Sequence, residues 1–284
     1  MTDKIGNEYK FSPEYIEAAV DENKKCFLRS LIPFLSVHNG LRRGKLHVFM
    51  GDTHSGKSTF MRTLLIDVLQ NNSDKNIFLF LSEESTNDFL IELHGTLEIL
   101  GDKTKCRKIL KKVKVLSAVD EHNITKNKLF MYLKQVKPDL FIFDNLTTCS
   151  FYDKYEKQEA FIKESKSFVK ELDIPFVYYI HTKKKDMGKS NYLGTDDVRG
   201  SQTIGNIAEF FYSLQIIANE EYDQLLRKEQ TVKHSICRMV KHRGYEVRSD
   251  TFYLGYSKDK KIYDKITQIS FKDLRTIWKE RNVL

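Results

Sequence analysis

Apolar residues fall into two different patterns along the chain, and the pattern changes near residue 209. Before that point, near-continuous apolar runs of four or five residues alternate with longer stretches in which apolar positions recur every three or four residues. Runs of the first kind are typical of strands buried on both faces, and stretches of the second kind are typical of amphipathic helices. The strands predicted here are Leu46–Met50, Ile77–Leu81, Val113–Leu116, Leu140–Phe143 and Phe176–Ile180. The alternation predicts a parallel sheet covered by helices on both faces.

After Glu209 the strand-like runs are joined mainly by short turns. Short connections favour antiparallel pairing, so we expect these strands to extend the same sheet. They are Phe210–Ile217, Ser235–Lys241, Asp250–Tyr256 and Lys261–Asp264. The predicted fold class is α/β, with a mostly parallel central sheet flanked by helices and extended by C-terminal antiparallel strands.

Helices are also expected near both ends of the sequence. Ser12-Pro13-Glu14 combines an N-cap residue, a proline at the first helical position and a carboxylate in the first turn, which predicts a helix to about Leu31. Ser270-Phe271-Lys272-Asp273 has the form of a capping box at the start of a final helix. Because we find no low-complexity linker or internal repeat, we expect an N-terminal helical arm in residues 1–40 and one domain in residues 41–284.

Composition and charge narrow the class of protein. Of the 284 residues, 40% are hydrophobic and 12% are aromatic, which is enough for a sizeable core and excludes wholesale disorder. The formal net charge of +8 suits a nucleic-acid partner, although a lysine-rich surface gives the same charge. The scattered cysteines Cys26, Cys106, Cys149 and Cys237 have no metal-binding spacing, as expected of reduced thiols in a cytoplasmic protein. No stretch has the length of a membrane span, and the first residues lack the apolar region of a signal peptide, so no membrane partner is expected.

The segment from Gly51 to Ser58 matches the phosphate-binding pattern GxxxxGK[ST]. A predicted strand precedes it and a predicted helix over residues 59–69 follows it, which is the context that the pattern requires. In this setting, backbone N–H groups and the helix N-terminus bind phosphate, Lys57 reaches the β- and γ-phosphates, and the Ser58 hydroxyl is a ligand of Mg²⁺. We therefore predict ATP and Mg²⁺ as cofactors. The predicted binding residues are Gly51, Asp52, Thr53, His54, Ser55, Gly56, Lys57, Ser58 and Thr59.

Three other predicted strands end in polar side chains. Asp144 follows an apolar run in the form of a Walker B motif, whose carboxylate holds Mg²⁺ through water, although it could instead cap the next turn. Glu83 and Glu84 follow another strand, where a glutamate can orient or deprotonate the water that attacks the γ-phosphate. Acids in this position also serve simply as charges at a helix start. His181 ends a third strand, from which its side chain can report the presence of the γ-phosphate, although a lone histidine is more often structural.

Two basic segments are candidates for binding phosphate groups outside this loop. The first contains Lys183, Lys184, Lys185 and Lys189. It is a glycine-containing loop without apolar periodicity, which is typical either of a backbone-gripping nucleic-acid loop or of a solvated one. The second, Lys241-His242-Arg243, lies at a predicted hairpin turn, from which an arginine can reach the γ-phosphate of a neighbouring subunit. A basic hairpin tip is the simpler interpretation.

Taken in order, these segments resemble the RecA-like core of hexameric replicative helicases. The similarity is to plasmid RepA-type helicases and to the DnaB helicase domain, with KaiC-like ATPases as more distant relatives, and it covers about residues 32–264. The matching positions are Gly51–Ser58 for the first helicase motif, Glu83 for the catalytic glutamate, Asp144 for the Walker B aspartate, His181 for the γ-phosphate sensor, Arg199-Gly200-Ser201 for an R-G-S segment, and Lys241 with Arg243 for the pair inserted into the neighbouring subunit's site.

The resemblance implies an ATP-dependent DNA helicase or translocase. It implies a homo-oligomer, a hexameric ring, that hydrolyses ATP at subunit interfaces while moving on single-stranded DNA in replication, with an initiator or primase as a further partner. Lys57, Glu83, His181, Lys241 and Arg243 would then be catalytic. The DNA-binding residues implied are Lys183, Lys184, Lys185, Lys189 and Arg199. The sequence departs from the family pattern in having Glu84 beside Glu83, which leaves the catalytic base ambiguous, and few basic residues in 147–155.

Two other classes of function stay open. The first is a recombination ATPase of the RecA or RadA kind, which forms filaments without separating strands. The second is a KaiC-like, nucleotide-dependent regulator that does not use DNA. The basic loop and the Lys241 and Arg243 pair favour a DNA-dependent oligomer over the regulator, but they do not separate a helicase from a recombinase.

Overall fold

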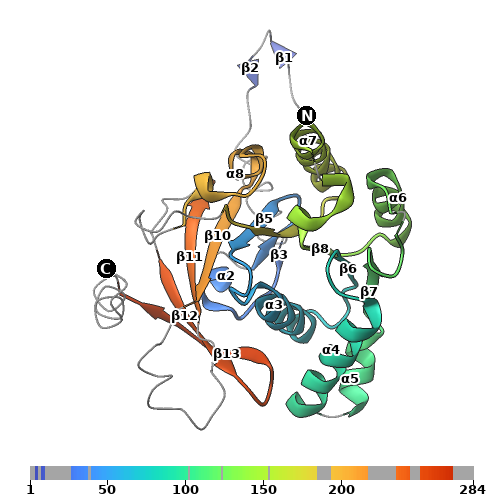
Figure 1. Cartoon of the computed structure of the whole chain (residues 1–284), viewed down its shortest axis with the longest axis vertical. Coiled ribbons are helices and arrows are strands. Elements are labelled where there is room, and N and C mark those ends of the chain that lie inside the picture. Colours follow the sequence, from blue (N-terminus) through green and yellow to red (C-terminus); the bar gives the residue numbers. More distant parts are fainter. Residues whose placement is uncertain are drawn as a thin grey trace.

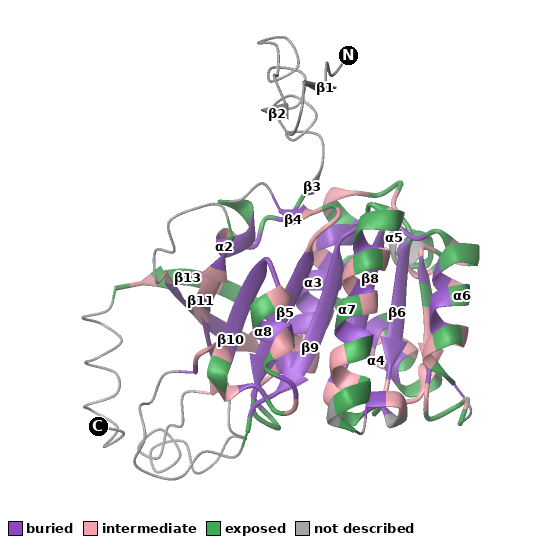
Figure 2. Ribbon diagram, turned by 90° about the horizontal axis from the view of Figure 1, so that it is seen from above, coloured by how far each residue is buried: buried purple, intermediate pink, exposed green. Residues whose placement is uncertain are grey.

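The computed structural model describes residues 4–5, 8–9, 27–37, 40–101, 103–122, 124–152, 154–183, 193–216, 235–243 and 250–270. Within these ranges a nine-stranded sheet forms the centre of the molecule, and helices cover both of its faces (Figure 1). Most residues of the central strands are buried, whereas the exposed residues lie mainly on the helices, the turns and the outermost strands (Figure 2).

The sheet has the strand order β13-β12-β11-β10-β5-β9-β8-β6-β7. Its parallel part consists of β5 (Leu46–Gly51), β6 (Ile77–Leu81), β7 (Val113–Ser117), β8 (Leu140–Asp144), β9 (Phe176–His181) and β10 (Phe210–Ile216). Its antiparallel extension consists of β11 (Ser235–His242), β12 (Thr251–Ser257) and β13 (Ile262–Ile269). The predicted α/β class is therefore confirmed. The predicted strand limits agree within one residue except at β13, which runs to Ile269 rather than ending at Asp264.

Helices cover the two faces of the sheet through two separate apolar clusters. The first cluster joins the sheet to α3 (Lys57–Asn71), α4 (Thr86–Leu100) and α5 (Lys103–Leu110). The second joins it to α6 (Lys126–Val136), α7 (Tyr155–Leu172) and α8 (Thr203–Ile207). Strand alternation produces this division, because successive residues of β5 such as Val48 and Phe49 belong to opposite clusters.

The N-terminal prediction is wrong at one end. A helix was expected to reach about Leu31, but β3 (Phe27–Leu28) is a strand paired with β4 (Leu41–Arg42), and β1 (Lys4–Ile5) pairs with β2 (Glu8–Tyr9). Ile32 also has an extended backbone, because α2 (Pro33–Ser36) begins with proline, which disfavours a helical residue before it. The rest of that predicted helix, and the final helix expected after Ser270, lie outside the described residues.

Residues on both sides of the predicted boundary at residue 40 pack into the same core. Leu28, Phe34 and Leu35 belong to the first apolar cluster together with residues of β5 and α3. The Phe34 ring lies 5.7 Å from that of Phe60, measured between centroids. Residues 28–35 therefore stabilise the face of the sheet that carries α3.

Strand register brings four strand ends to one edge of the sheet. Gly51 at the end of β5 is opposite His181 of β9 and Leu214 of β10, and Leu81 of β6 is opposite Asp144 of β8. In open parallel sheets, ligands bind beyond the carboxyl ends of the strands. This edge is therefore the expected place of a functional site.

Candidate functional site

The loop between β5 and α3 is a tight turn that depends on its two glycines. A Cβ atom on Gly51 would lie 2.3 Å from Ser55 Oγ and 2.6 Å from the Leu214 carbonyl oxygen. Gly56 is the N-cap of α3 with φ of 86°, and a Cβ there would lie 2.0 Å from the Tyr263 hydroxyl. Asp52, Thr53 and His54 are exposed at the turn, and Thr59 lies in the first turn of α3.

Lys57 places a buried cation inside this loop, and Ser55 places a buried hydroxyl there. The Lys57 ammonium donates to the carbonyl oxygens of Gly51 (3.0 Å) and Asp52 (2.6 Å). Burial lowers the pKa of Lys57, and the nearby Asp144, Glu83 and Asp52 oppose that shift. Ser55 Oγ is buried with no hydrogen-bond partner among the described residues. A buried cation, an unpaired hydroxyl and a helix N-terminus fit a phosphate group.

Ser58 and Asp144 form the second half of this pocket. The Ser58 hydroxyl donates to Asp144 Oδ2 at 3.1 Å. Burial raises the pKa of Asp144 to about 6, although the Ser58 hydrogen bond and Lys57 both favour the ionised form. One hydroxyl and one carboxylate suit Mg²⁺, which usually keeps several waters and takes its other ligands from substrate phosphates. The described residues contain no cluster of three or more His, Cys, Asp or Glu side chains able to hold a metal ion by themselves.

The burial of Asp144 predicts a pH-dependent change in stability on substitution. Its pKa is about 6 in the folded protein against an ordinary 3.8, so the unliganded fold loses stability as pH rises between these values. Asp144→Asn should therefore stabilise the protein at pH 8, raising the free energy of unfolding by at most about 3 kcal/mol and with it the melting temperature. This gain should vanish towards pH 4. Thermal denaturation of both proteins across this range would test it, and a gain that does not change with pH would contradict it.

The two adjacent glutamates point to different partners. Glu83 Oε1 lies 3.4 Å from His181 Nε2, and hydrogen bonding to His181 lowers the pKa of Glu83. Glu84 instead pairs with Arg62 of α3 at 3.5 Å, and burial raises the pKa of Glu84. Arg62 also contacts Glu92 at 2.5 Å. Glu83 therefore faces the end of β9 and the loop lysine, whereas Glu84 is turned towards α3 and α4.

Hydroxyl side chains that sequence reasoning missed support Glu83 and His181. The His181 backbone N–H donates to Thr147 Oγ1 at 3.2 Å, and a hydrogen bond from Thr148 lowers the pKa of Glu83. Thr182 donates to Asp52 of the phosphate loop. No motif marks these residues, because threonines are common after strands and only the register of β8 and β9 brings them to the site.

Lys241 and Arg243 lie far from the phosphate loop of their own chain. The Lys241 ammonium donates to the carbonyl oxygens of Gly205 (2.6 Å) and Asn206 (2.9 Å), and Arg243 donates to that of Asn206. The opposite end of β11 touches the phosphate loop, where Ser235 Oγ donates to the Ser55 carbonyl oxygen at 3.2 Å. Eight residue steps of about 3.3 Å separate Ser235 from Arg243, or about 26 Å.

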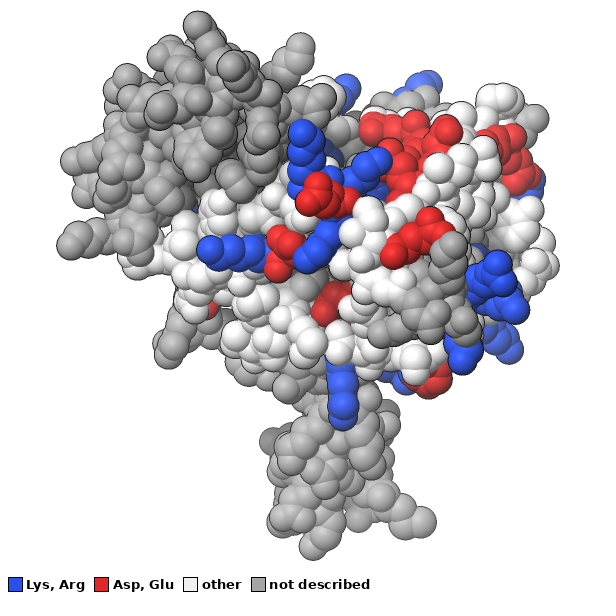
Figure 3. All heavy atoms as spheres, turned by 90° about the horizontal axis from the view of Figure 1, so that it is seen from below, with Lys and Arg blue, Asp and Glu red and all other residues white. Residues whose placement is uncertain are grey.

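Only part of the predicted DNA-binding segment is described. Lys183 and Arg199 are exposed, and residues around them pair, since the Arg199 N–H donates to the His181 carbonyl oxygen at 3.0 Å. Lys184, Lys185 and Lys189 lie outside the described residues. The face drawn in Figure 3 carries basic and acidic side chains interspersed, so it does not present a patch of one sign.

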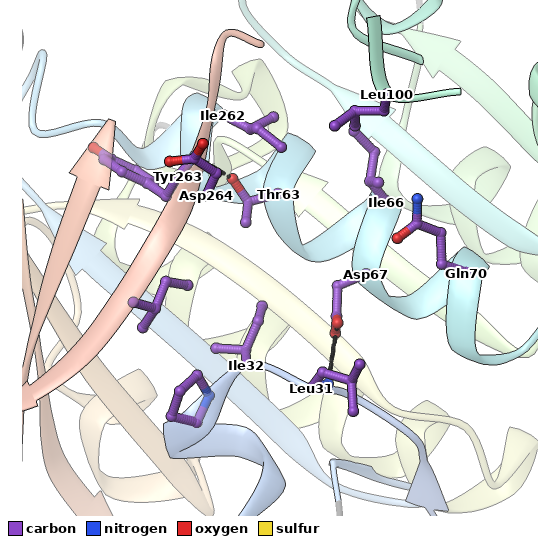
Figure 4. Close-up of a pocket in the computed structure, with 12 residues that line it drawn as sticks. Leu31, Ile32, Thr63, Ile66, Asp67, Gln70, Leu100, Ile262, Tyr263 and Asp264 are labelled. Atoms are coloured by element: carbon purple, nitrogen blue, oxygen red, sulfur yellow. Dashed lines mark hydrogen bonds between the residues drawn. The ribbon is translucent and has the colours of Figure 1, made fainter. Parts of the chain in front are cut away.

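A cavity of about 340 Å³ lies beside α3, and no residue of the phosphate loop lines it (Figure 4). Side chains of α3, including Ile66 and Asp67, line one wall, and residues 31–33 and β13 line the others. The Asp67 carboxylate is already held by the Leu31 backbone N–H, at 3.0 Å from Oδ1. The cavity therefore offers no counterpart of the glycine loop and its lysine.

Comparison with known proteins bears on the fold. No family model matches the sequence, and no curated protein matches it. A solved structure titled "ATPase Domain of G40P" matches with a TM-score of 0.67 and 13% sequence identity, over 92% of this chain and 100% of that one. At this identity the likeness shows the fold, and the RecA-like fold class predicted from the sequence is confirmed. No helix in the described residues is long and apolar enough to cross a membrane.

Proposed function

We propose that this chain is a P-loop ATPase that works as a ring-forming DNA helicase or translocase on single-stranded DNA. The observation that carries the proposal is the meeting of Lys57, Ser58, Glu83, Asp144 and His181 at one edge of the sheet. This set contains one group for each task of phosphoryl transfer to water: holding phosphate, holding the metal, activating water and sensing the γ-phosphate.

Each residue has a role that its surroundings support. Lys57 would exchange its two carbonyl partners for the β- and γ-phosphates. Ser58 would hold Mg²⁺ directly and Asp144 through water, and the ion would neutralise charge on the phosphates. Because hydrogen bonding lowers its pKa, Glu83 is ionised at neutral pH and can accept a proton from the attacking water. The pairing of Glu84 with Arg62 favours Glu83 over Glu84 for that role.

A partner subunit would complete the site. Lys241 lies about 20 Å and Arg243 about 26 Å from Ser235, the residue that touches their own phosphate loop, so they are too far away to stabilise charge on their own nucleotide. They are held by carbonyl oxygens at the end of α8, where a helix C-terminus favours cations. From this place they would reach the γ-phosphate bound to the next copy of the chain, in a ring that we propose to be hexameric.

DNA would contact the loop that follows β9. Lys183 directly follows the His181-Thr182 pair at the nucleotide edge, and Arg199 returns beside it. A contact between DNA and this loop would therefore lie two residues from the γ-phosphate sensor. Contacts from Lys184, Lys185 and Lys189, and a replication initiator or primase as partner, belong to the same proposal.

One assay separates this proposal from its alternatives. We expect single-stranded DNA to raise the ATP hydrolysis rate several-fold and the protein to displace a strand from a forked duplex in the presence of ATP and Mg²⁺. A Lys57→Ala variant should neither hydrolyse ATP nor displace the strand, because it lacks the lysine that binds the phosphates. This variant is the control for contaminating activity. Stimulation without displacement would support a recombination ATPase, and hydrolysis indifferent to DNA would support a regulator.

A further inference from the structure

Two hydroxyl groups from the antiparallel extension lie directly behind the phosphate loop. Ser235 opens β11, and its Oγ donates to the Ser55 carbonyl oxygen at 3.2 Å. The Tyr263 hydroxyl on β13 lies 2.8 Å from the same Ser235 Oγ. Both side chains are buried, so water does not compete for these hydrogen bonds.

The direction of the hydrogen bonds follows from the number of protons. A serine hydroxyl has one hydrogen, and Ser235 uses it for the Ser55 carbonyl oxygen, which cannot itself donate. Tyr263 must therefore donate to Ser235. Burial raises the pKa of Tyr263 to about 12, so it keeps the proton that this bond requires. The bonds run in one direction, from Tyr263 to Ser235 to the Ser55 carbonyl.

This chain of bonds fixes one peptide of the phosphate loop. The Ser55 C=O and the Gly56 N–H belong to the same planar trans peptide, so they point in opposite directions. With the carbonyl held towards β11, the Gly56 N–H points away from β11. Gly56 is the N-cap of α3 and precedes Lys57, so its N–H is at the end of the helix where anions bind.

Both the backbone and the hydroxyl of Tyr263 are held in place, so this residue can fix the orientation of Ser235. Its backbone N–H donates to Thr63 Oγ1 of α3 at 3.0 Å. Its hydroxyl fills the space behind Gly56, where an added Cβ would lie only 2.0 Å away, with Ser235 Oγ at 3.3 Å. Figure 4 shows Tyr263 and Thr63 side by side at the wall of the cavity. Rotation of the Ser55–Gly56 peptide would have to displace these groups.

We propose that Ser235 is a positioning residue of the phosphate site, which presents the Gly56 N–H to bound phosphate, and that Tyr263 holds Ser235 in the required orientation. The proposal rests on the proposed function in one respect, that the loop binds a nucleotide. It assigns the antiparallel extension a part in nucleotide affinity.

The test compares Ser235→Ala, Tyr263→Phe and the double variant in the full chain. The measurement is the Kd of Mg-ADP by calorimetry, beside the melting temperature without nucleotide. Ser235→Ala removes the donor to the carbonyl, and loss of one hydrogen bond should raise Kd roughly 3- to 10-fold. Tyr263→Phe should raise it less, since Ser235 can still donate, and the double variant should match Ser235→Ala. Ser235→Thr, which restores a hydroxyl, should recover most of the affinity.

A matched control separates positioning from general stability. Ser165 of α7 is equally buried and donates at 2.7 Å to the carbonyl oxygen of Phe161, which belongs to the second apolar cluster rather than to the one that contains α3. Ser165→Ala should lower the melting temperature without changing Kd. An unchanged Kd in Ser235→Ala, or a larger effect from Tyr263→Phe than from Ser235→Ala, would overturn the inference while the proposed function stands. Failure of the wild-type protein to bind Mg-ADP would overturn both.

Discussion

Replacing Glu83 with glutamine should lower kcat for ATP hydrolysis by at least about 100-fold while Mg-ATP still binds. Glutamine keeps the size of the side chain and its contact with His181 but cannot take a proton from water. Since Glu83 is half-exposed and pairs with His181 at 3.4 Å rather than with the loop backbone, the substitution leaves the phosphate ligands in place. Steady-state hydrolysis and the binding of a slowly hydrolysed ATP analogue measure the two effects separately.

Glu84→Gln is the matched control for this substitution. Glu84 is paired with Arg62, and burial already raises the pKa of this carboxyl, so neutralising it should cost little activity. If Glu84→Gln lost more kcat than Glu83→Gln, the assignment of the base would be reversed.

Removing the Arg243 side chain should abolish hydrolysis for a different reason. If this guanidinium stabilises the transition state in the neighbouring subunit's site, Arg243→Ala should lower kcat by about 1000-fold or more while nucleotide affinity stays close to that of the wild type. The variant also loses a hydrogen bond to the Asn206 carbonyl oxygen, so its melting temperature must be compared with that of the wild type.

Mixing two inactive variants tests directly whether two neighbouring subunits contribute residues to one ATP site. Arg243→Ala subunits keep an intact phosphate loop, and Lys57→Ala subunits keep an intact Arg243. At an interface where the Arg243→Ala subunit supplies the phosphate loop and the Lys57→Ala subunit supplies Arg243, the site has all its wild-type residues. The mixture should therefore recover part of the activity that neither variant has. If Arg243 serves only its own chain, the mixture will be as inactive as its components.

Local pattern was sufficient for the sheet and for the first half of the site. Near-continuous apolar runs predicted β5, β6 and β8 within one residue, because strands buried on both faces need such runs whatever surrounds them. The phosphate loop was predictable for a similar reason, since its glycines and its lysine act within eight consecutive residues.

The rest of the site depends on contacts between distant parts of the chain. Glu83 and Glu84 are indistinguishable in sequence, and only the positions of His181 and Arg62 separate them. Ser235 carries no motif, because its partner carbonyl is 180 residues away. Phe27–Leu28 forms a strand rather than the end of the predicted helix because it pairs with Leu41 and Arg42, which a helix-start signal at Ser12-Pro13-Glu14 cannot reveal.

The two ends of β11 have a consequence for how neighbouring subunits would communicate. One end is bonded to the phosphate loop of its own subunit, and the other carries the cations proposed for the next subunit's nucleotide. β11 pairs with β10 from Ser235 to His242, with a register shift opposite Phe211 and Tyr212, and with β12 from Ser235 to Arg238, so both of its ends are hydrogen-bonded within the sheet. In the proposed ring, a displacement of the phosphate loop on nucleotide binding could therefore be transmitted through β11 to the cations at the next subunit's nucleotide, without involving DNA.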